Sequence, residues 1–343
     1  MNFFKPAHEP GKPGSLSGEK DIFAMLEEEL SSALSMYWEI AGGILEGSGV
    51  RLLDPPSGYL SIENNFFSAL FLYSYCRAGI KKSRRIIYSA MNQCLRGMVT
   101  GCDNLLDNEY KKTLITDLPE GGTKFRSVLD IMVSDRVLFE LSLNSFKEKE
   151  KILASSIMSL QGLVRSGYQE AAEESGIDEI LLPDSVINEI HHYKTGILFN
   201  CPWAVPSVIE ELDEGMVKYL NNSLYRIGIG CQIMDDMADV ISDVHTGRHN
   251  YIASLIYHES GAESYKLLRS MASEETENYT RGDVYMKFGS ARNKACLKAR
   301  SYLSEGFRDL FEEKYRWLVE SAIVFLAGRI GVDKYFQAGC HED

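Results

Sequence analysis

The chain has 343 residues, of which 45% are hydrophobic, so it is long enough to bury a large core and is not an intrinsically disordered protein. Its formal net charge of −13 argues against a nucleic-acid partner, because phosphate backbones are bound by clusters of lysine and arginine. The seven cysteines are scattered without a metal-binding spacing, which favours free thiols in a reducing compartment over a disulfide framework.

The first segment, residues 1–20, contains several prolines and glycines without apolar periodicity, which predicts a disordered N-terminal tail. It lacks the apolar core of a secretory signal. No later stretch is apolar for long enough to predict a transmembrane segment. We therefore expect a cytoplasmic protein.

Beyond the tail, apolar residues recur mostly at spacings of three and four, whereas the alternation typical of strands is scarce. This periodicity, interrupted by turn-forming segments such as DPPSG and HTGRHN, predicts an all-α fold. The expected helices cover residues 21–46, 61–79, 81–110, 123–145, 147–174, 183–200, 204–243, 249–258, 261–275, 283–303 and 306–330. Because no repeat or linker divides them, we expect one domain over 21–335, followed by a C-terminal tail at 336–343.

One predicted helix carries four aspartates within the stretch CQIMDDMADVISDVHTGRHN, residues 231–250. Helical spacing places Asp235, Asp239 and Asp243 in one stripe, with Asp236 beside it. Such like charges repel one another. A solvated acidic face is the simpler interpretation, but the surrounding isoleucines and methionines leave too little other polar surface for an outer helix. The pattern therefore predicts a bound cation.

A second acidic pair, Asp103 and Asp107, also shares a helix face, and Lys111 and Lys112 follow about one turn later. If the two acidic faces lie opposite each other across a cavity, their carboxylates can bind Mg²⁺ ions that bridge to a diphosphate. The lysines and Arg248 would then meet the remaining charge of the diphosphate.

Four segments resemble motifs of the trans-isoprenyl diphosphate synthases, or polyprenyl synthetases, a family of class I isoprenoid synthases, and they follow one another along the chain as the family's motifs do. QIMDDMADVISDVHTGR resembles the second aspartate-rich motif of the family, with Arg248 where lysine is usual. YKTGILF at 193–199 resembles its Lys-Thr helix, SGYQEA at 166–171 its Gly-Gln helix, and MVSDRVLFELS at 132–142 the segment after its first motif, with Ser134 in place of glycine. The resemblance extends over roughly residues 60–255 and implies an isoprenoid synthase helical bundle around a central apolar cavity.

The resemblance also implies the roles of the site residues. Mg²⁺, about three ions bound together with the substrate diphosphate, is the implied cofactor. An allylic prenyl diphosphate is the implied substrate, and a homodimer is the implied assembly. The metal-binding residues would be Asp103, Asp107, Asp235, Asp236, Asp239 and Asp243; the diphosphate-binding residues Lys111, Lys112, Lys194 and Arg248; and the catalytic groups Lys194, Thr195, Gln232 and Gln169. His191 and His192 are expected to be ordinary surface or capping residues.

The sequence departs from the family pattern at two places. Asn104 replaces the second aspartate of the first motif, and an amide brings no negative charge to a metal. Upstream, the family has a basic segment that holds the diphosphate of the isopentenyl acceptor, but SIENNFFSAL at 61–70 contains one acid, Glu63, and no base, and Arg51 lies too early. The ordinary chain-elongation reaction is therefore in question.

Four functions remain compatible with the sequence. Prenyl transfer or polyprenyl diphosphate synthesis is the family's usual reaction. A terpene cyclase acting on a C15 or longer prenyl diphosphate without isopentenyl diphosphate is the close alternative, and head-to-head condensation is a third. A non-catalytic partner subunit of a prenyl synthase belongs to a different class, and it would release no diphosphate when purified alone.

Overall fold

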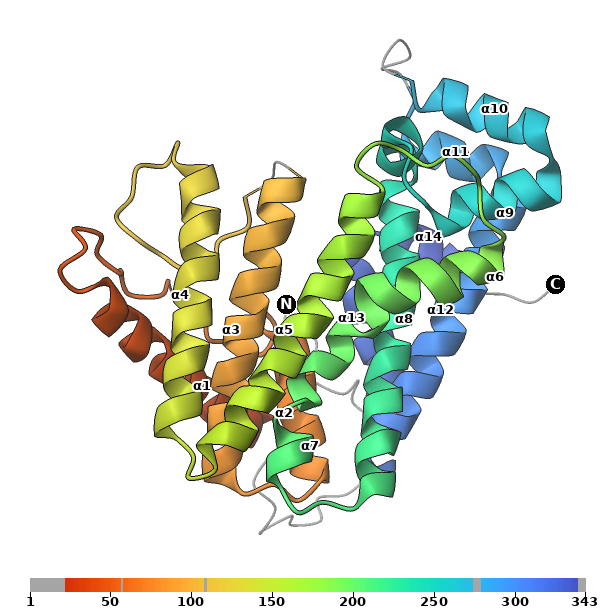
Figure 1. The fold of residues 1–343 in the computed structure, drawn as a ribbon. Coiled ribbons are helices and arrows are strands. Elements are labelled where there is room, and N and C mark those ends of the chain that lie inside the picture. Colours follow the sequence, from red (N-terminus) through yellow and green to blue (C-terminus); the bar gives the residue numbers. More distant parts are fainter. Residues whose placement is uncertain (1–21, 57, 108–109, 274–278, 339–343) are drawn as a thin grey trace, which may run out of the picture. The chain divides into compact units, whose positions relative to one another are not determined.

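The computed structural model describes residues 22–56, 58–107, 110–273 and 279–338, and these residues form helices connected by turns and loops (Figure 1). Within these ranges the only β pairing is an isolated bridge between Leu52 and Thr116. The all-α prediction is therefore confirmed. No helix in these ranges combines the length and apolar character that crossing a bilayer requires.

The described residues group into two compact units. Unit 1 extends to Ser156 and includes Val205–Glu211; unit 2 comprises Ile157–Ala204 and the chain from Leu212 onward. The prediction of one domain over 21–335 concerns the association of these units and stays a prediction. The predicted tail at 1–20, and residues 339–343 of the predicted C-terminal tail, lie outside the described residues.

Unit 1 is built around three long helices. Its elements are α1 (Ile22–Leu45), α2 (Phe66–Arg77), α3 (Lys82–Leu106), α4 (Thr123–Asn144), the first part of α5 (Lys149–Ala172) and the short α7 (Pro206–Ile209). Helix α3 packs along both α4 and α1. Charged side chains join α1 to α3, because Arg85 forms an ion pair with Glu29, whose side chain is fully buried.

Unit 2 is built around the pair α8 and α12, which pack along each other (Figure 1). Its elements are the rest of α5, α6 (Pro183–Ser185), the π-helix η1 (Val186–Gly196), the 3-10 helix η2 (Leu198–Trp203), α8 (Glu214–Thr246), α9 (Tyr251–Ser260), α10 (Ala262–Met271), α11 (Arg281–Lys287), α12 (Gly289–Leu310), the 3-10 helix η4 (Glu313–Tyr315), α13 (Leu318–Ile330) and α14 (Asp333–Ala338).

Helix α8 begins and ends at residues suited to those positions. Asp213 caps its first turn by accepting a hydrogen bond of 2.7 Å from the backbone N–H of Met216. Gly247 follows its last residue with φ of 71°, a left-handed conformation that glycine adopts without strain. The prediction of one continuous helix over 204–243 is wrong at its start, because α7 ends at Ile209 and the Asp213 cap begins a new helix.

Four other predicted helices differ from the structure. The predicted helices over 283–303 and 306–330 are wrong in their bounds, because α11 ends at Lys287 and α12 is continuous from Gly289 to Leu310. The predicted helix over 61–79 begins only at Phe66, because Asn65 uses its side-chain amide to bind the backbone carbonyls of Tyr59 and Ser61 in the preceding turn. The predicted helix over 183–200 consists mainly of a π-helix and a 3-10 helix. Side-chain periodicity does not distinguish these types from an α-helix over so short a span.

Close approach between α8 and α12 depends on glycine. A Cβ atom on Gly306 would lie 2.7 Å from Ile227 Cγ1 and 2.8 Å from the backbone oxygen of Ser223. Gly230 is similarly close to Leu303, at 2.6 Å. Because both positions lack a side chain, the two backbones can approach closely. The buried apolar residues of α8 then pack against α12, and the aspartates of α8 lie elsewhere on that helix.

We expect Gly306→Ala to lower the free energy of unfolding by about 1–3 kcal/mol, because the added methyl group collides with fixed backbone atoms. Gly328→Ala in α13 is the matched control, since no atom lies within 4 Å of its added Cβ. The control should stabilise the protein by about 0.5–1 kcal/mol through helix propensity. Urea unfolding measures both, and equal effects of the two substitutions would contradict the proposed crowding.

Candidate functional site

The four aspartates of α8 differ in their surroundings. Asp235 and Asp239 are exposed, Asp243 is half-buried, and Asp236 is 4% exposed. The predicted stripe is therefore present on the helix, and Asp236 points away from it into the interior of unit 2. The exposed pair can reach a solvent-borne cation, whereas Asp236 depends on protein groups to satisfy its charge.

Asp236 is held by groups from three segments. Its Oδ2 lies 2.9 Å from Nε2 of His191 in η1 and accepts a hydrogen bond of 2.6 Å from the backbone N–H of Tyr251 in α9. Its Oδ1 accepts a hydrogen bond of 3.3 Å from the side chain of Gln232. Burial alone would raise the pKa of Asp236, but His191 and these donors outweigh burial and hold that pKa below its ordinary value.

His191 is a site residue that the sequence did not indicate. We expected an ordinary surface or capping residue, but His191 is 1% exposed and contacts Asp236. Its Nδ1 is buried without a hydrogen-bond partner in the structure. No local signal in the sequence could have identified it, because its partner lies 45 positions away.

Asn250 connects Asp243 and Asp236 in one hydrogen-bond network. Asn250 donates hydrogen bonds of 2.8 Å to Asp243 Oδ2 and to the backbone oxygen of Asp236, while its own Oδ1 caps the start of α9. Burial and the neighbouring charge of Asp236 raise the pKa of Asp243. Asp243 therefore binds a proton more readily than an ordinary aspartate does.

Asp235 is also shifted toward its protonated form. Nearby protein atoms displace water from the carboxylate of Asp235, and this loss of hydration is the largest cause that raises its pKa. Repulsion from Asp239 and Asp236 raises the pKa further, to about 7, although part of the side chain remains exposed. The repulsion expected from the sequence is thus present in the structure. A divalent cation between these carboxylates would relieve it.

The π-helix η1 presents Lys194 and Thr195 beside α8. The backbone oxygen of Lys194 accepts a hydrogen bond of 2.7 Å from Ser166, and Gly196 leaves room for the ring of Tyr225. Thr195 donates a hydrogen bond to Gln232 Oε1, and Gln232 in turn donates to Asp235 at 3.2 Å. Three of the predicted site residues are therefore joined directly.

Lys194 and Arg248 lie near a common acid, Glu170 of α5. The distance from Lys194 Nζ to Glu170 Oε1 is 2.7 Å, and that from Arg248 Nη1 to Glu170 Oε2 is 3.8 Å. Burial would lower the pKa of Lys194, but Glu170, Asp243 and Asp236 raise it, so the ammonium group stays charged. Glu170 is adjacent to the predicted Gln169 but was not itself predicted.

Gln169 does not contact the other predicted site residues through its hydrogen bond in this structure. Its amide donates to Glu173 Oε1 at 3.1 Å, and Glu173 Oε2 accepts a bond of 3.0 Å from the backbone N–H of His249. Gln169 and Glu173 therefore support the turn after α8, next to Arg248.

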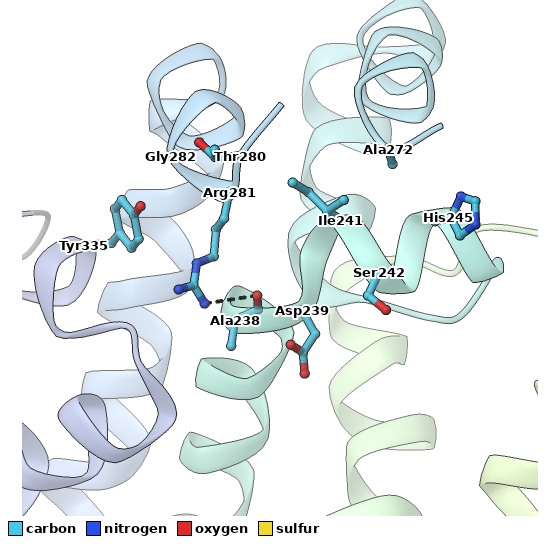
Figure 2. A pocket seen from close by; sticks show the side chains of 10 residues that line it. All are labelled: Ala238, Asp239, Ile241, Ser242, His245, Ala272, Thr280, Arg281, Gly282 and Tyr335. Atoms are coloured by element: carbon cyan, nitrogen blue, oxygen red, sulfur yellow. Dashed lines mark hydrogen bonds between the residues drawn. The ribbon is translucent and has the colours of Figure 1, made fainter. Parts of the chain in front are cut away.

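A cavity of about 770 Å³ opens beside the aspartate stripe in unit 2 (Figure 2). Asp239, Ser242 and His245 line it from α8, and Thr280 and Arg281 line it from the start of α11. Arg281 donates a hydrogen bond of 3.0 Å to the backbone oxygen of Ala238. Asp239 is thus reachable from solvent through this cavity.

The acidic pair of unit 1 lies at the end of α3. Asp103 and Asp107 are exposed, and the backbone N–H of Asp107 bonds to the oxygen of Asp103 at 2.9 Å, which keeps them one turn apart. Helix α3 ends at Leu106, so the prediction of a helix to residue 110 is wrong. Lys111 and Lys112 are exposed residues of the following loop.

Asn104 has a structural function at this helix end. Its side chain is 3% exposed, accepts a hydrogen bond of 2.7 Å from the backbone N–H of Lys111 and donates one of 3.0 Å to the backbone oxygen of Lys111. An aspartate could accept the first bond but could not donate the second. The amide therefore anchors the loop that carries both lysines.

The segment before α2 is tied to protein groups as well. Asn65 accepts a hydrogen bond from Arg96 of α3, and Arg51 forms an ion pair of 2.9 Å with Asp117. Arg51 thus has a partner within unit 1, and SIENNFFSAL contributes no base of its own.

No three His, Cys, Asp or Glu side chains of the described ranges converge in a metal-binding geometry. The donor set nevertheless fits Mg²⁺, because hard carboxylate oxygens crowd on one helix face, where burial and then their mutual repulsion raise the pKa of Asp235. Asp235 and Asp239 are the residues of α8 open to such an ion.

The fold resembles several solved prenyl synthase structures. Geranylgeranyl pyrophosphate synthetase from Pyrococcus horikoshii Ot3 matches with a TM-score of 0.65 and 17% identity over 89% of this chain and 98% of that chain. Decaprenyl diphosphate synthase from Rhodobacter capsulatus matches with a TM-score of 0.59 and 14% identity over 90% and 98% of the two chains. Octaprenyl pyrophosphate synthase from Helicobacter pylori matches with a TM-score of 0.58 and 14% identity over 88% and 98%. The chain has the all-helical fold of the prenyl synthases.

The sequence comparison adds a match to a family model over part of the chain. Residues 181–278 match the polyprenyl synthetase family model, a span that contains η1 and α8. No curated protein matches the chain. The predicted resemblance to the polyprenyl synthetase family is thereby confirmed, with residues 181–278 as the matching segment.

We expect Asn104→Asp to destabilise the protein by about 1–3 kcal/mol, because the buried carboxylate faces the backbone oxygen of Lys111 without a proton to donate. Thermal and urea unfolding at pH 7 measure the effect. Asn104→Ala separates loss of the bond from the added charge and should cost less. An Asn104→Asp variant as stable as the wild type would contradict the anchoring function of the amide.

In the absence of divalent metal, stability should decline as the pH rises through about 7. The folded pKa of Asp235 lies above its ordinary value of 3.8, so the folded state holds a proton that the unfolded state has lost. This contribution is complete below the unfolded pKa and disappears as Asp235 ionises. Melting temperatures in EDTA from pH 5 to 8 should therefore fall for the wild type relative to Asp235→Asn. Parallel pH profiles for the two proteins would show that Asp235 does not titrate in this range.

Proposed function

We propose that the protein is a Mg²⁺-dependent class I isoprenoid synthase that ionises an allylic prenyl diphosphate and transfers the resulting prenyl cation. The observation that carries the proposal is the aspartate face of α8 in the segment that matches the family, with Lys194 and Arg248 beside it. Acidic and basic groups placed side by side suit a diphosphate bridged by metal ions.

The aspartates would hold the metal. Asp235 and Asp239 are exposed for direct ligation, and Asp243 and Asp236 would support them. Asp103 and Asp107 of unit 1 would form the second metal-binding face, and the meeting of both faces across a central apolar cavity stays part of the proposal. Bound Mg²⁺ would supply positive charge that neutralises the diphosphate as it departs.

Protein groups would complete the leaving-group site. Lys194 and Arg248 would bind the diphosphate from unit 2, and Lys111 and Lys112 would bind it from unit 1. Thr195 and Gln232, joined by a hydrogen bond, would orient the leaving group or stabilise the cation through their dipoles. We propose a supporting position for Gln169, through Glu173 and the turn after α8.

A terpene cyclase is the second candidate, and the surroundings of SIENNFFSAL favour it. This segment brings no base for a second diphosphate, and the nearest upstream arginine, Arg51, forms an ion pair with Asp117. Intramolecular capture of the cation requires no isopentenyl diphosphate, so it would tolerate the loss of that site.

We propose a cytoplasmic homodimer. An exposed apolar stripe on α4, formed by Phe125, Val128, Met132 and Phe139, supports the dimer, since these residues share one helix face. Contiguous apolar surface of this kind is typical of a protein interface, and a two-fold axis would pair the stripe with itself.

The test is release of diphosphate from C10, C15 and C20 allylic diphosphates with Mg²⁺, with and without isopentenyl diphosphate, followed by mass spectrometry of the products. We expect release that depends on Mg²⁺. It should fall by about 100-fold or more in Asp235→Asn, because the Mg²⁺ that would stabilise the charge of the departing diphosphate loses a carboxylate ligand. Asp54→Asn, an exposed acid outside the proposed site, is the control and should retain activity.

The products then separate the candidates. Products longer by C5 that require isopentenyl diphosphate would establish chain elongation, and hydrocarbons or alcohols formed without it would indicate a cyclase. No release from any substrate would refute catalysis and favour the partner-subunit alternative.

A further inference from the structure

The carboxylate of Glu170 lies between two basic side chains of unit 2, Lys194 and Arg248. Its Oε1 lies 2.7 Å from Lys194 Nζ and its Oε2 lies 3.8 Å from Arg248 Nη1. The three residues come from α5, from η1 and from the turn after α8, so Glu170 joins segments distant in sequence. Its two oxygens each face a different cation, as two oxygens of a bound diphosphate would.

The three side chains are partly withdrawn from water, with 18% of Glu170, 22% of Lys194 and 25% of Arg248 exposed. Their interactions are therefore stronger than those of ion pairs on the open surface. Asp236 and Asp243 also act on Lys194, and both raise its pKa. Without bound metal, the positive charges of Lys194 and Arg248 are thus balanced or outweighed by the negative charges of nearby carboxylates.

We propose that Glu170 is an internal counter-anion that occupies the diphosphate position between Lys194 and Arg248 and makes diphosphate binding depend on divalent cations. The inference rests on the proposed function. An incoming diphosphate must displace Glu170 from both cations and then remain close to its negative charge. Metal ions bound to the aspartates of α8 would offset that repulsion, whereas in their absence the diphosphate would be excluded.

Isothermal titration calorimetry of inorganic diphosphate into the full chain tests this, once in EDTA and once in Mg²⁺. The wild type should bind with Mg²⁺ and only weakly without it. Glu170→Gln removes the charge at nearly constant size, so affinity in EDTA should rise by roughly tenfold, as loss of a partly buried charge interaction predicts.

Two control variants isolate the charge and its position. Glu174→Gln removes the same charge from the exposed turn after α5 and should leave both affinities unchanged. Glu170→Asp keeps the charge and should preserve the dependence on Mg²⁺. Circular dichroism checks folding, and Glu170→Ala replaces Glu170→Gln if the latter does not fold.

The outcomes separate this inference from the proposed function. A wild type that fails to bind diphosphate even with Mg²⁺ would overturn the proposed function. If the wild type binds with Mg²⁺ but Glu170→Gln shows no gain in EDTA, the counter-anion proposal is wrong and the proposed function stands. Loss of Mg²⁺-dependent binding in Glu170→Gln, with no gain in EDTA, would instead make Glu170 a metal ligand and also overturn the counter-anion proposal.

Discussion

The candidate site of unit 2 depends on the buried charge of Asp236. A carboxylate withdrawn from water is costly unless protein groups replace its hydration, and here His191, Gln232 and the backbone of Tyr251 do so. These partners belong to η1, α8 and α9. Satisfying one charge therefore fixes three segments to one another: η1, which carries Lys194, and the two helices α8 and α9, which are joined by the turn that carries Arg248.

The same interaction determines the electrostatics of the neighbouring aspartates. His191 and the hydrogen-bond donors hold the pKa of Asp236 low, so it stays ionised, and its negative charge then contributes to the raised pKa values of Asp235 and Asp243. A neutral residue at position 236 would remove this repulsion. A bound cation would consequently stabilise the exposed Asp235 and Asp239 most, whereas the buried Asp236 is already stabilised by protein groups. The same motif therefore contains residues suited to binding a cation and a residue that holds the surrounding segments together.

Much of this arrangement could be predicted from the sequence, but the contacts between residues distant in the chain could not. Periodicity predicted an all-α fold and placed Asp235, Asp239 and Asp243 on one face of a helix, because both depend on residues close together in the chain. The contact between His191 and Asp236 joins residues 45 positions apart, so no local pattern reports it. The Gly-Gln resemblance pointed to α5 and indicated Gln169, whereas the neighbouring Glu170 is the residue that contacts Lys194 and Arg248.

Asn104 illustrates how a substitution in a motif can have a positional cause. Considered as a metal ligand, the amide is a loss of negative charge beside Asp103 and Asp107. In the structure, however, it both accepts from and donates to the backbone of Lys111, which a carboxylate cannot do. An amide in place of a carboxylate gives up the negative charge but gains a second hydrogen bond, and this bond helps to fix the start of the loop that carries Lys111 and Lys112. If those lysines bind a diphosphate, the amide weakens the metal side of the site while it orders the basic side, and the two effects oppose each other in the affinity for a metal–diphosphate complex.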